Sequence, residues 1–389
     1  MSRLSLLLFL LAALSSPPAL CAVVYDVTSL GATPDGVTDS ADAFLRAWSA
    51  SCSSTSPATI YVPAATFLVS RADFSGPCVN SEIVFQIDGT IVAPSDYNVN
   101  GVSGYWIVIR SVSGVSVIGG VLDGRGAALW ACKRAGGNCP TGATNLEFSN
   151  ANNIFISGLK SRHSQMFHIV INACTDVNIQ GVKVSAPENS PNTDGIHVQG
   201  SSNVMITNSR IGTGDDCISI GPGCSNMWIE NIVCGPGHGI SIGSLGKALE
   251  EDGVQHVTVS KVTFTGTQNG VRIKSWEKKS NGFARNILFQ HARMINVQNP
   301  IIIDQHYCPF TQGCLKQGSG VQVSDVTYQD IHGTSATEVA VKLDCSSDRP
   351  CSKIKLENVK LMYQNQLATS SCSNAGGTAL GFISATDCL

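Results

Sequence analysis

Side chains capable of acid–base chemistry recur at a fixed interval in the middle of this 389-residue chain. Asp194 and Asp216 are 22 residues apart, and His238 follows after another 22 residues. Asp215 directly precedes Asp216. Clustered carboxylates repel each other unless one keeps its proton, and a held proton is what a general acid needs. The pattern therefore predicts an acid–base site. The alternative is a solvated polar ladder on the outside of a repeat protein.

The elements that position these residues are short β runs. Asp194, Asp216 and His238 each stand two places before a triplet whose first and third residues are apolar: Ile196–Val198, Ile218–Ile220 and Ile240–Ile242. A repeat of this length with glycine at its corners is typical of a parallel β-helix. Equivalent positions on successive turns stack about 4.8 Å apart. We therefore expect the three residues in one column, with Asp215 beside it.

The repeat extends from Asn153 to about Met362 and contains two families of strands. The first family includes Ile154, Val177, Val204, Met227, Val257, Ile287, Val323 and Ile354, and the second continues the triplets as Val271–Ile273, Ile301–Ile303 and Val341–Leu343. A doubly wound α/β fold is the alternative, but intervals such as Thr207 to Thr213 leave no room for a helix. An amphipathic helix at Asp39–Ser51 is expected to cap the N-terminal end.

The N-terminal segment is predicted to be a signal peptide of residues 1–22. Arg3 precedes an apolar run, which small residues and prolines follow up to Ala22. No other apolar run is long enough to span a bilayer, so we expect an exported, soluble protein with one all-β domain over residues 23–389. Charged residues make up 14% of the chain and the net charge is −3, which indicates no nucleic-acid or membrane partner. We expect a monomer.

Cysteine usage supports export, because fifteen cysteines in such a chain predict disulfides. Cys174 and Cys224 follow strands two turns apart, about 9.6 Å, which exceeds disulfide reach. We therefore expect that these two are not bonded to each other. A zinc site is the alternative, but no C-x-x-C pair occurs and no metal is expected. Neighbouring cysteines suggest these pairs: Cys52–Cys78, Cys217–Cys234, Cys308–Cys314, Cys345–Cys351 and Cys372–Cys388.

Two cations extend the polar column beyond His238. Arg272 and Lys274 share one strand face on the next turn, where like charges repel unless an anion lies near. The aligned positions on the preceding turn carry no acid, so we expect both cations to bind a substrate carboxylate. A solvated surface pair is the alternative. Tyr307, one turn further on, brings an aromatic ring close to this face or serves as ordinary edge packing.

Four segments in this order resemble the motifs of the polygalacturonases, glycoside hydrolase family 28, most closely the plant branch: Asn192-Thr193-Asp194, Gly214-Asp215-Asp216, Gly237-His238-Gly239 and Arg272-Ile273-Lys274. The resemblance covers essentially the whole chain after residue 22. It implies a right-handed parallel β-helix of the pectin-lyase-like kind. It also implies a secreted cell-wall enzyme without a cofactor, which hydrolyses the α-1,4 linkages of polygalacturonic acid in de-esterified pectin with inversion.

The resemblance further implies a role for each site residue. Asp215 is the general acid, Asp194 and Asp216 hold and activate the attacking water, and His238 supports protonation of the acid. Stacked carboxylates about 4.8 Å apart are closer to the retaining than to the inverting arrangement. We follow the family on stereochemistry. The substrate-binding residues are expected to be Asn192, Arg272, Lys274 and Tyr307.

Other functions fit parts of the pattern. A pectate lyase can share the fold and substrate, but it would need calcium-binding carboxylates and a basic residue as proton acceptor. A catalytically silent wall-binding protein would normally lack some of the acids, which are all present. A rhamnogalacturonan hydrolase is a nearer alternative, although Lys274 favours an all-galacturonate substrate. Loops at the ends of the groove decide between endo and exo attack, and of the two we expect endo.

Overall fold

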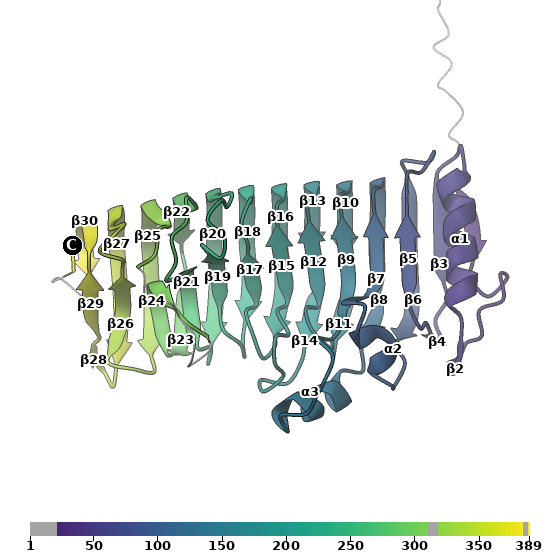
Figure 1. Cartoon of the computed structure of the whole chain (residues 1–389), viewed down its shortest axis with the longest axis horizontal. Helices are drawn as coiled ribbons and strands as arrows, with labels where there is room; N and C mark the ends of the chain where they lie inside the picture. Colours follow the sequence, from purple (N-terminus) through teal and green to yellow (C-terminus); the bar gives the residue numbers. More distant parts are fainter. Residues whose placement is uncertain (1–21, 310–317, 384–387) are drawn as a thin grey trace, which may run out of the picture.

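The computed structural model describes residues 22–309, 318–383 and 388–389. Over these residues the chain is a right-handed parallel β-helix, drawn in Figure 1 as one elongated stack of strands. The fold class predicted from the 22-residue repeat is confirmed. The expected signal peptide lies outside the described residues except for Ala22. None of the helices within the described ranges is long and apolar enough to cross a membrane.

The described strands form two long sheets, in which all pairings are parallel except the short β27–β28 pair. Sheet A has 19 strands: β1 (Val23–Asp26), β2 (Asp35–Asp39), β3 (Ala58–Val62), β4 (Thr66–Leu68), β6 (Ile83–Val92), β8 (Ser113–Asp123), β10 (Asn152–Ser157), β11 (Lys160–Arg162), β13 (Thr175–Gln180), β14 (Lys183–Ser185), β16 (Ser202–Gly212), β18 (Ser225–Cys234), β20 (Val254–Thr265), β22 (Phe283–Gln290), β23 (Arg293–Val297), β25 (Gln322–Ser335), β27 (Cys351–Tyr363), β28 (Gln366–Leu367) and β30 (Ala375–Ile383).

Sheet B lies opposite and has 11 described strands: β5 (Ala72–Ser75), β7 (Tyr105–Arg110), β9 (Thr144–Ser149), β12 (Ile169–Asn172), β15 (Ile196–Gln199), β17 (Ile218–Ile220), β19 (Ile240–Leu245), β21 (Asn269–Trp276), β24 (Asn299–Tyr307), β26 (Val339–Asp344) and β29 (Thr369–Ser373).

The core consists of columns of aliphatic side chains. Ile196, Ile218, Ile240 and Val271 pair in register on successive turns and are fully buried. Burying one such side chain contributes about 1.5–3 kcal/mol, and every turn repeats the gain. The inward-facing triplet residues are confirmed, and so is the first strand family except for Val323: Val326 is the residue that aligns with Ile287 and Ile354.

Residues in the left-handed backbone conformation form the corner of sheet A. Gly158, Gly181, Asn208 and Asn231 occupy this corner with φ of 68°, 62°, 54° and 56°. Glycine and asparagine adopt such angles at least cost. The Asn231 amide donates to the Asn208 side-chain oxygen at 2.7 Å, so the corner of one turn is hydrogen-bonded to the next. The sharp bend therefore recurs without a long loop.

The helix α1 (Ala41–Ser53) covers the N-terminal end of the stack, as Figure 1 shows. Trp48 is buried there, with its ring 5.4 Å from that of Phe74 and 5.9 Å from that of Phe85. The predicted capping helix is confirmed, with bounds two residues further along the chain. Two shorter helices were not predicted: α2 (Asn98–Gly101) and α3 (Ala127–Arg134).

Disulfides connect neighbouring segments largely as predicted. Cys308 is also disulfide-bonded, and its predicted partner Cys314 lies outside the described residues. The Cys132–Cys139 bridge, at the end of α3, was not predicted. Four predicted pairs are present: Cys52–Cys78, Cys217–Cys234, Cys345–Cys351 and Cys372–Cys388.

Cys174 and Cys224 are not bonded to each other, as predicted; both are free and buried, which gives a test of the turn spacing. We expect a thiol reagent to leave both residues unlabelled in the native protein and to label both after unfolding without reductant. Mass spectrometry of the digested protein would identify the labelled peptides. A Cys174–Cys224 peptide in a non-reducing digest would contradict the register described here.

Candidate active site

The loops that lead from sheet A into sheet B carry the predicted catalytic residues. Asp194, Asp216 and His238 each stand two residues before a strand of sheet B, namely β15, β17 and β19. Backbone bonds continue the strand pairing through these loops: the Gly195 N–H donates to the Asp216 carbonyl at 2.9 Å, and the His238 N–H donates to that of Asp215 at 2.8 Å. The predicted column is present because the strand register extends into the loops.

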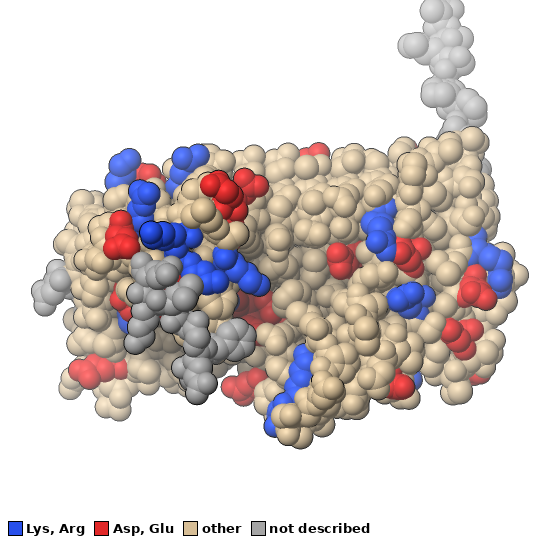
Figure 2. Space-filling model, in the orientation of Figure 1, with Lys and Arg blue, Asp and Glu red and all other residues tan. Residues whose placement is uncertain are grey.

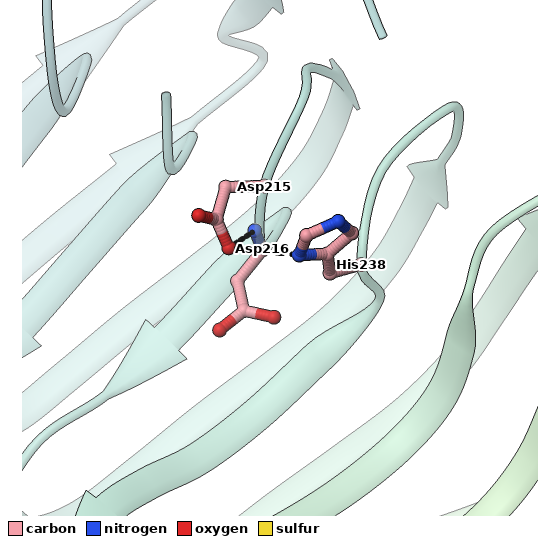
Figure 3. Close-up of side chains that lie close together, drawn as sticks. All are labelled: Asp215, Asp216 and His238. Atoms are coloured by element: carbon pink, nitrogen blue, oxygen red, sulfur yellow. Dashed lines mark hydrogen bonds and ion pairs between the residues drawn. The ribbon is translucent and has the colours of Figure 1, made fainter. Parts of the chain in front are cut away.

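Asp215 and His238 form a pair near the surface of this site. The Asp215 carboxylate lies 3.0 Å from His238 Nδ1 and also accepts the Asp216 backbone N–H at 2.8 Å. Figure 3 shows the Asp215 carboxylate toward the imidazole ring and the Asp216 carboxylate extending in another direction. Both members of the pair are partly exposed. Asp215 is therefore the acid of this cluster that a substrate can most readily reach.

Asp216 is fully buried and is held by three donors. It accepts hydrogen bonds from Arg272 at 2.7 Å, Lys274 at 2.8 Å and the Ser241 hydroxyl at 2.8 Å. Burial disfavours the charged carboxylate, but the two cations outweigh it and lower the pKa of Asp216 to about 2. Asp216 is therefore ionised throughout the physiological range.

This ion cluster corrects one prediction. We expected Arg272 and Lys274 to lack an acidic partner, because the preceding turn offers none at the aligned positions. Their partner is Asp216, two turns away, and the long side chains reach back across the intervening turn. Since both cations are buried, they are not a solvated surface pair.

Asp194 is the carboxyl group of this cluster whose pKa is raised, which favours its protonated form. It is buried, and its described side-chain partner is the Ser219 hydroxyl, which donates at 2.7 Å. Burial raises the pKa of Asp194 well above its usual range, and the nearby charges of Asp215 and Asp216 raise it further. The raised pKa of Asp194 agrees with the prediction that one of the clustered carboxyl groups would stay protonated.

The predicted substrate-binding residues lie around the acids. Asn192 lies beside Asp215, with its amide nitrogen 3.5 Å from the carboxylate. The Tyr307 ring centre lies 5.2 Å from the Lys274 ammonium, and Trp276 packs on the same ring at 5.4 Å. The structure thus brings all eight residues predicted for the site into one region.

Comparison with known proteins identifies the family. The model of "Glycosyl hydrolases family 28" matches residues 52–381, which include the whole site. The chain belongs to glycosyl hydrolase family 28. It is 65% identical over 368 residues to a polygalacturonase of Prunus persica, covering 94% of each chain. It is 43% identical to an exopolygalacturonase of Platanus acerifolia, covering 92% of this chain and 96% of that one.

Solved structures show the same fold at lower identity. The endo-xylogalacturonan hydrolase of Aspergillus tubingensis superposes with a TM-score of 0.81 at 23% identity, over 92% of this chain and 99% of that one. The polygalacturonase of Erwinia carotovora gives a TM-score of 0.68 at 22% identity, over 94% and 98%. These similarities support the assignment of the β-helix fold to this chain.

Three further residues contribute to the site of this glycoside hydrolase and were not predicted as members. Ser219 and Ser241 donate to Asp194 and Asp216, and His197 Nδ1 lies 2.8 Å from the Ser219 hydroxyl. All three occupy the middle position of their sheet B triplets, the same column as Arg272. The position that they share with Arg272 was a usable signal in the sequence. Residues of one column face the same side of the sheet, so neighbours of a predicted substrate-binding cation are expected near the site.

Within the described part of the chain, two groups of side chains have the donor atoms of a metal site, with the atoms of each group within 4.8 Å of one another: Asp215, Asp216 and His238, and Asp304, His306 and Asp344. In the first group both Asp216 oxygens already accept bonds from cations. A metal ion there would meet the charges of Arg272 and Lys274. The residues of this family 28 site therefore fit a metal poorly.

The ion cluster predicts a large effect of replacing Asp216 on stability. Asp216→Asn would leave Arg272 and Lys274 buried without a charged partner, which costs about 3–5 kcal/mol. We expect denaturant unfolding to show a loss of this size, and the exposed Asp176→Asn to show almost none. Replacing all three members, as Asp216→Asn/Arg272→Met/Lys274→Met, should restore much of the loss. Equal stability of Asp216→Asn and wild type would contradict the described pairing.

The same cluster predicts a pH dependence. The pKa of Asp216 is lower in the folded chain than its ordinary 3.8, so the stability it contributes is present above about pH 4 and is lost as pH falls toward 2. The free energy of unfolding of wild type should therefore fall more steeply over this window than that of Asp216→Asn. Parallel curves for the two proteins would show that Asp216 does not titrate there.

Proposed function

We propose that this family 28 enzyme is a polygalacturonase that hydrolyses the α-1,4 linkages of de-esterified homogalacturonan. The observation that carries the proposal is the position of buried Arg272 and Lys274 beside the accessible Asp215–His238 pair. Cations next to a proton donor suit a substrate that carries a carboxylate on each sugar. The 65% identity to a polygalacturonase supports the same substrate.

In this proposal Asp215 protonates the leaving glycosidic oxygen. It is the accessible member of the three acids, and His238 lies within hydrogen-bonding distance of its carboxyl group. An imidazole at this distance can hold the proton between turnovers and orient the carboxyl group. Asn192 and Tyr307 line the sugar-binding positions on either side.

The attacking water is held between Asp194 and Asp216. Protonated Asp194 orients it, and ionised Asp216 accepts its proton as the bond to the anomeric carbon forms. The low pKa of Asp216 makes it a weak base in the free enzyme. A galacturonate carboxylate that binds Arg272 and Lys274 shares their charge, so substrate binding raises the pKa of Asp216 toward its ordinary range. The substrate thereby activates the base.

The separation of the acids bears on whether the reaction inverts or forms a covalent intermediate. Donor atoms of Asp215 and Asp216 lie within 4.8 Å of each other, a short separation of the kind that retaining enzymes use. However, Asp194 and Asp216 lie on successive turns, and a water molecule can lie beside two acids that are offset by a turn. We therefore propose direct attack by water, with inversion.

We further propose that residues 1–22 direct secretion to the cell wall and that residues 23–389 are one catalytic domain, active as a monomer. The disulfides support an oxidising compartment. We propose endo attack, because a hollow beside His197 continues the groove on one side of the site and Tyr307 continues it on the other. Long products early in digestion would support endo attack, and monomers alone would contradict it.

Replacing the proton donor tests the assignment of Asp215. Asp215→Asn should lower kcat on polygalacturonate by about 10²–10⁴-fold, the usual contribution of general acid catalysis, with an unchanged unfolding transition. The exposed Asp42→Asn on α1 is the matched control and should retain full activity. Near-normal turnover of Asp215→Asn would remove this residue from the mechanism.

The stereochemical proposal predicts the anomer of the product. Inversion at an α linkage releases the β anomer first, which then equilibrates with the α anomer. Proton NMR during the first turnovers of an oligogalacturonide would distinguish them, since the anomeric protons resonate separately. Initial release of the α anomer would show retention and would make Asp216 or Asp194 a nucleophile.

A further inference from the structure

The register of sheet B determines the charges along the floor of the groove. The outward-facing positions of one column are, in order from the N-terminal side, Val108, Glu147, Val170, His197, Ser219, Ser241 and Arg272. The cation Arg272 lies on the C-terminal side of the catalytic turns. On the N-terminal side the same column presents an acid, an aliphatic residue and an imidazole. The groove is therefore asymmetric in charge.

A hollow of about 260 Å³ lies over the N-terminal part of this column. Its lining includes Glu147, Met166, Phe167, Val170 and His197, and no described Lys or Arg residue lines it. The Phe167 and His197 rings stack at 4.9 Å, and burial lowers the pKa of His197, which favours the neutral imidazole. On the face drawn in Figure 2, Lys and Arg gather toward the C-terminal part.

Glu147 is the acidic residue of this hollow. The described residues make no hydrogen bond or ion pair to its side chain. Burial raises the pKa of Glu147, and the charge of Arg110 lowers it; Arg110 is itself bonded to Asp73 and to the Tyr105 hydroxyl. A sugar unit with an ionised carboxylate would meet this acid without a compensating cation. Like charges repel, and the rest of the lining offers a carboxylate no cation: Met166, Phe167 and Val170 are apolar, and Thr144, Asn172 and Gln199 are polar but uncharged.

We propose that this hollow is a subsite for an uncharged unit of the pectin chain, a galacturonate whose carboxyl group is a methyl ester. The ester methyl group would pack on the apolar lining, and the Phe167–His197 pair offers a flat surface to a pyranose ring. The enzyme then cleaves next to free galacturonate held by Arg272 and Lys274, with an esterified unit on the N-terminal side. This inference rests on the proposed polygalacturonase function and assigns the substrate pattern.

Removing the charge of Glu147 tests the subsite. Glu147→Gln keeps the side-chain shape and should raise kcat/KM on fully de-esterified polygalacturonate by about two- to fivefold, because the repulsion is gone. On pectin with a low, random degree of methyl-esterification the rise should be smaller. The gain on polygalacturonate should vanish at high salt, where the charges are screened. Glu82 is exposed and directly precedes β6 of sheet A, so Glu82→Gln should leave kcat/KM unchanged on both substrates.

Product analysis gives a second measurement. Mass spectrometry of oligomers from the partly esterified pectin should place methyl esters at a preferred distance from the newly formed end in wild type, and at less regular positions in Glu147→Gln. Equal effects of Glu147→Gln on both substrates, or ester positions identical in the two proteins, would overturn the proposal. A wild type inactive on both substrates would instead refute the polygalacturonase function, and the subsite with it.

Discussion

The parallel register of successive turns is the constraint on which this structure depends. Because β15, β17 and β19 pair without a shift, residues 22 apart in these turns lie one strand spacing apart, so a spatial column is seen in the sequence as a regular interval. The same register that stacks Ile196, Ile218 and Ile240 in the core also aligns the acids in the loops. Stability and catalysis thus share one geometric requirement, and a slip in pairing would disrupt both.

Two cations favour different protonation states of chemically similar acids in this stack. Arg272 and Lys274 keep Asp216 ionised at full burial, and that fixed charge helps to keep Asp194 protonated nearby. Asp215 lies at the accessible side with His238. The same residue type thereby meets three different environments, because each carboxyl group has different neighbours. The charge of the groove is organised in the same way, with the cations on the C-terminal side of the site and Glu147 on the other.

The periodic features could be predicted from the sequence, and the non-periodic ones could not. The column of Asp194, Asp216 and His238 followed from equal spacing, and the alignment of Ser241 with Arg272 followed from the repeated apolar triplets around them. The bonds from Arg272 and Lys274 to Asp216 span 56 and 58 residues and cross a turn, so strand alternation does not indicate them. Helix α3 with its Cys132–Cys139 bridge lies in an insertion outside the repeat. The protonated state of Asp194 depends on burial, which only the packed loops determine.

The central claim is that Asp194 carries the proton of this carboxyl cluster while Asp216 is ionised. Infrared difference spectroscopy of wild type against Asp194→Asn tests it most directly, since the C=O stretch of a protonated carboxyl group is separate from that of a carboxylate. At about pH 6, above the ordinary carboxyl range, we predict that wild type shows a protonated carboxyl band that the variant lacks. A spectrum of wild type with carboxylate bands alone would contradict the account.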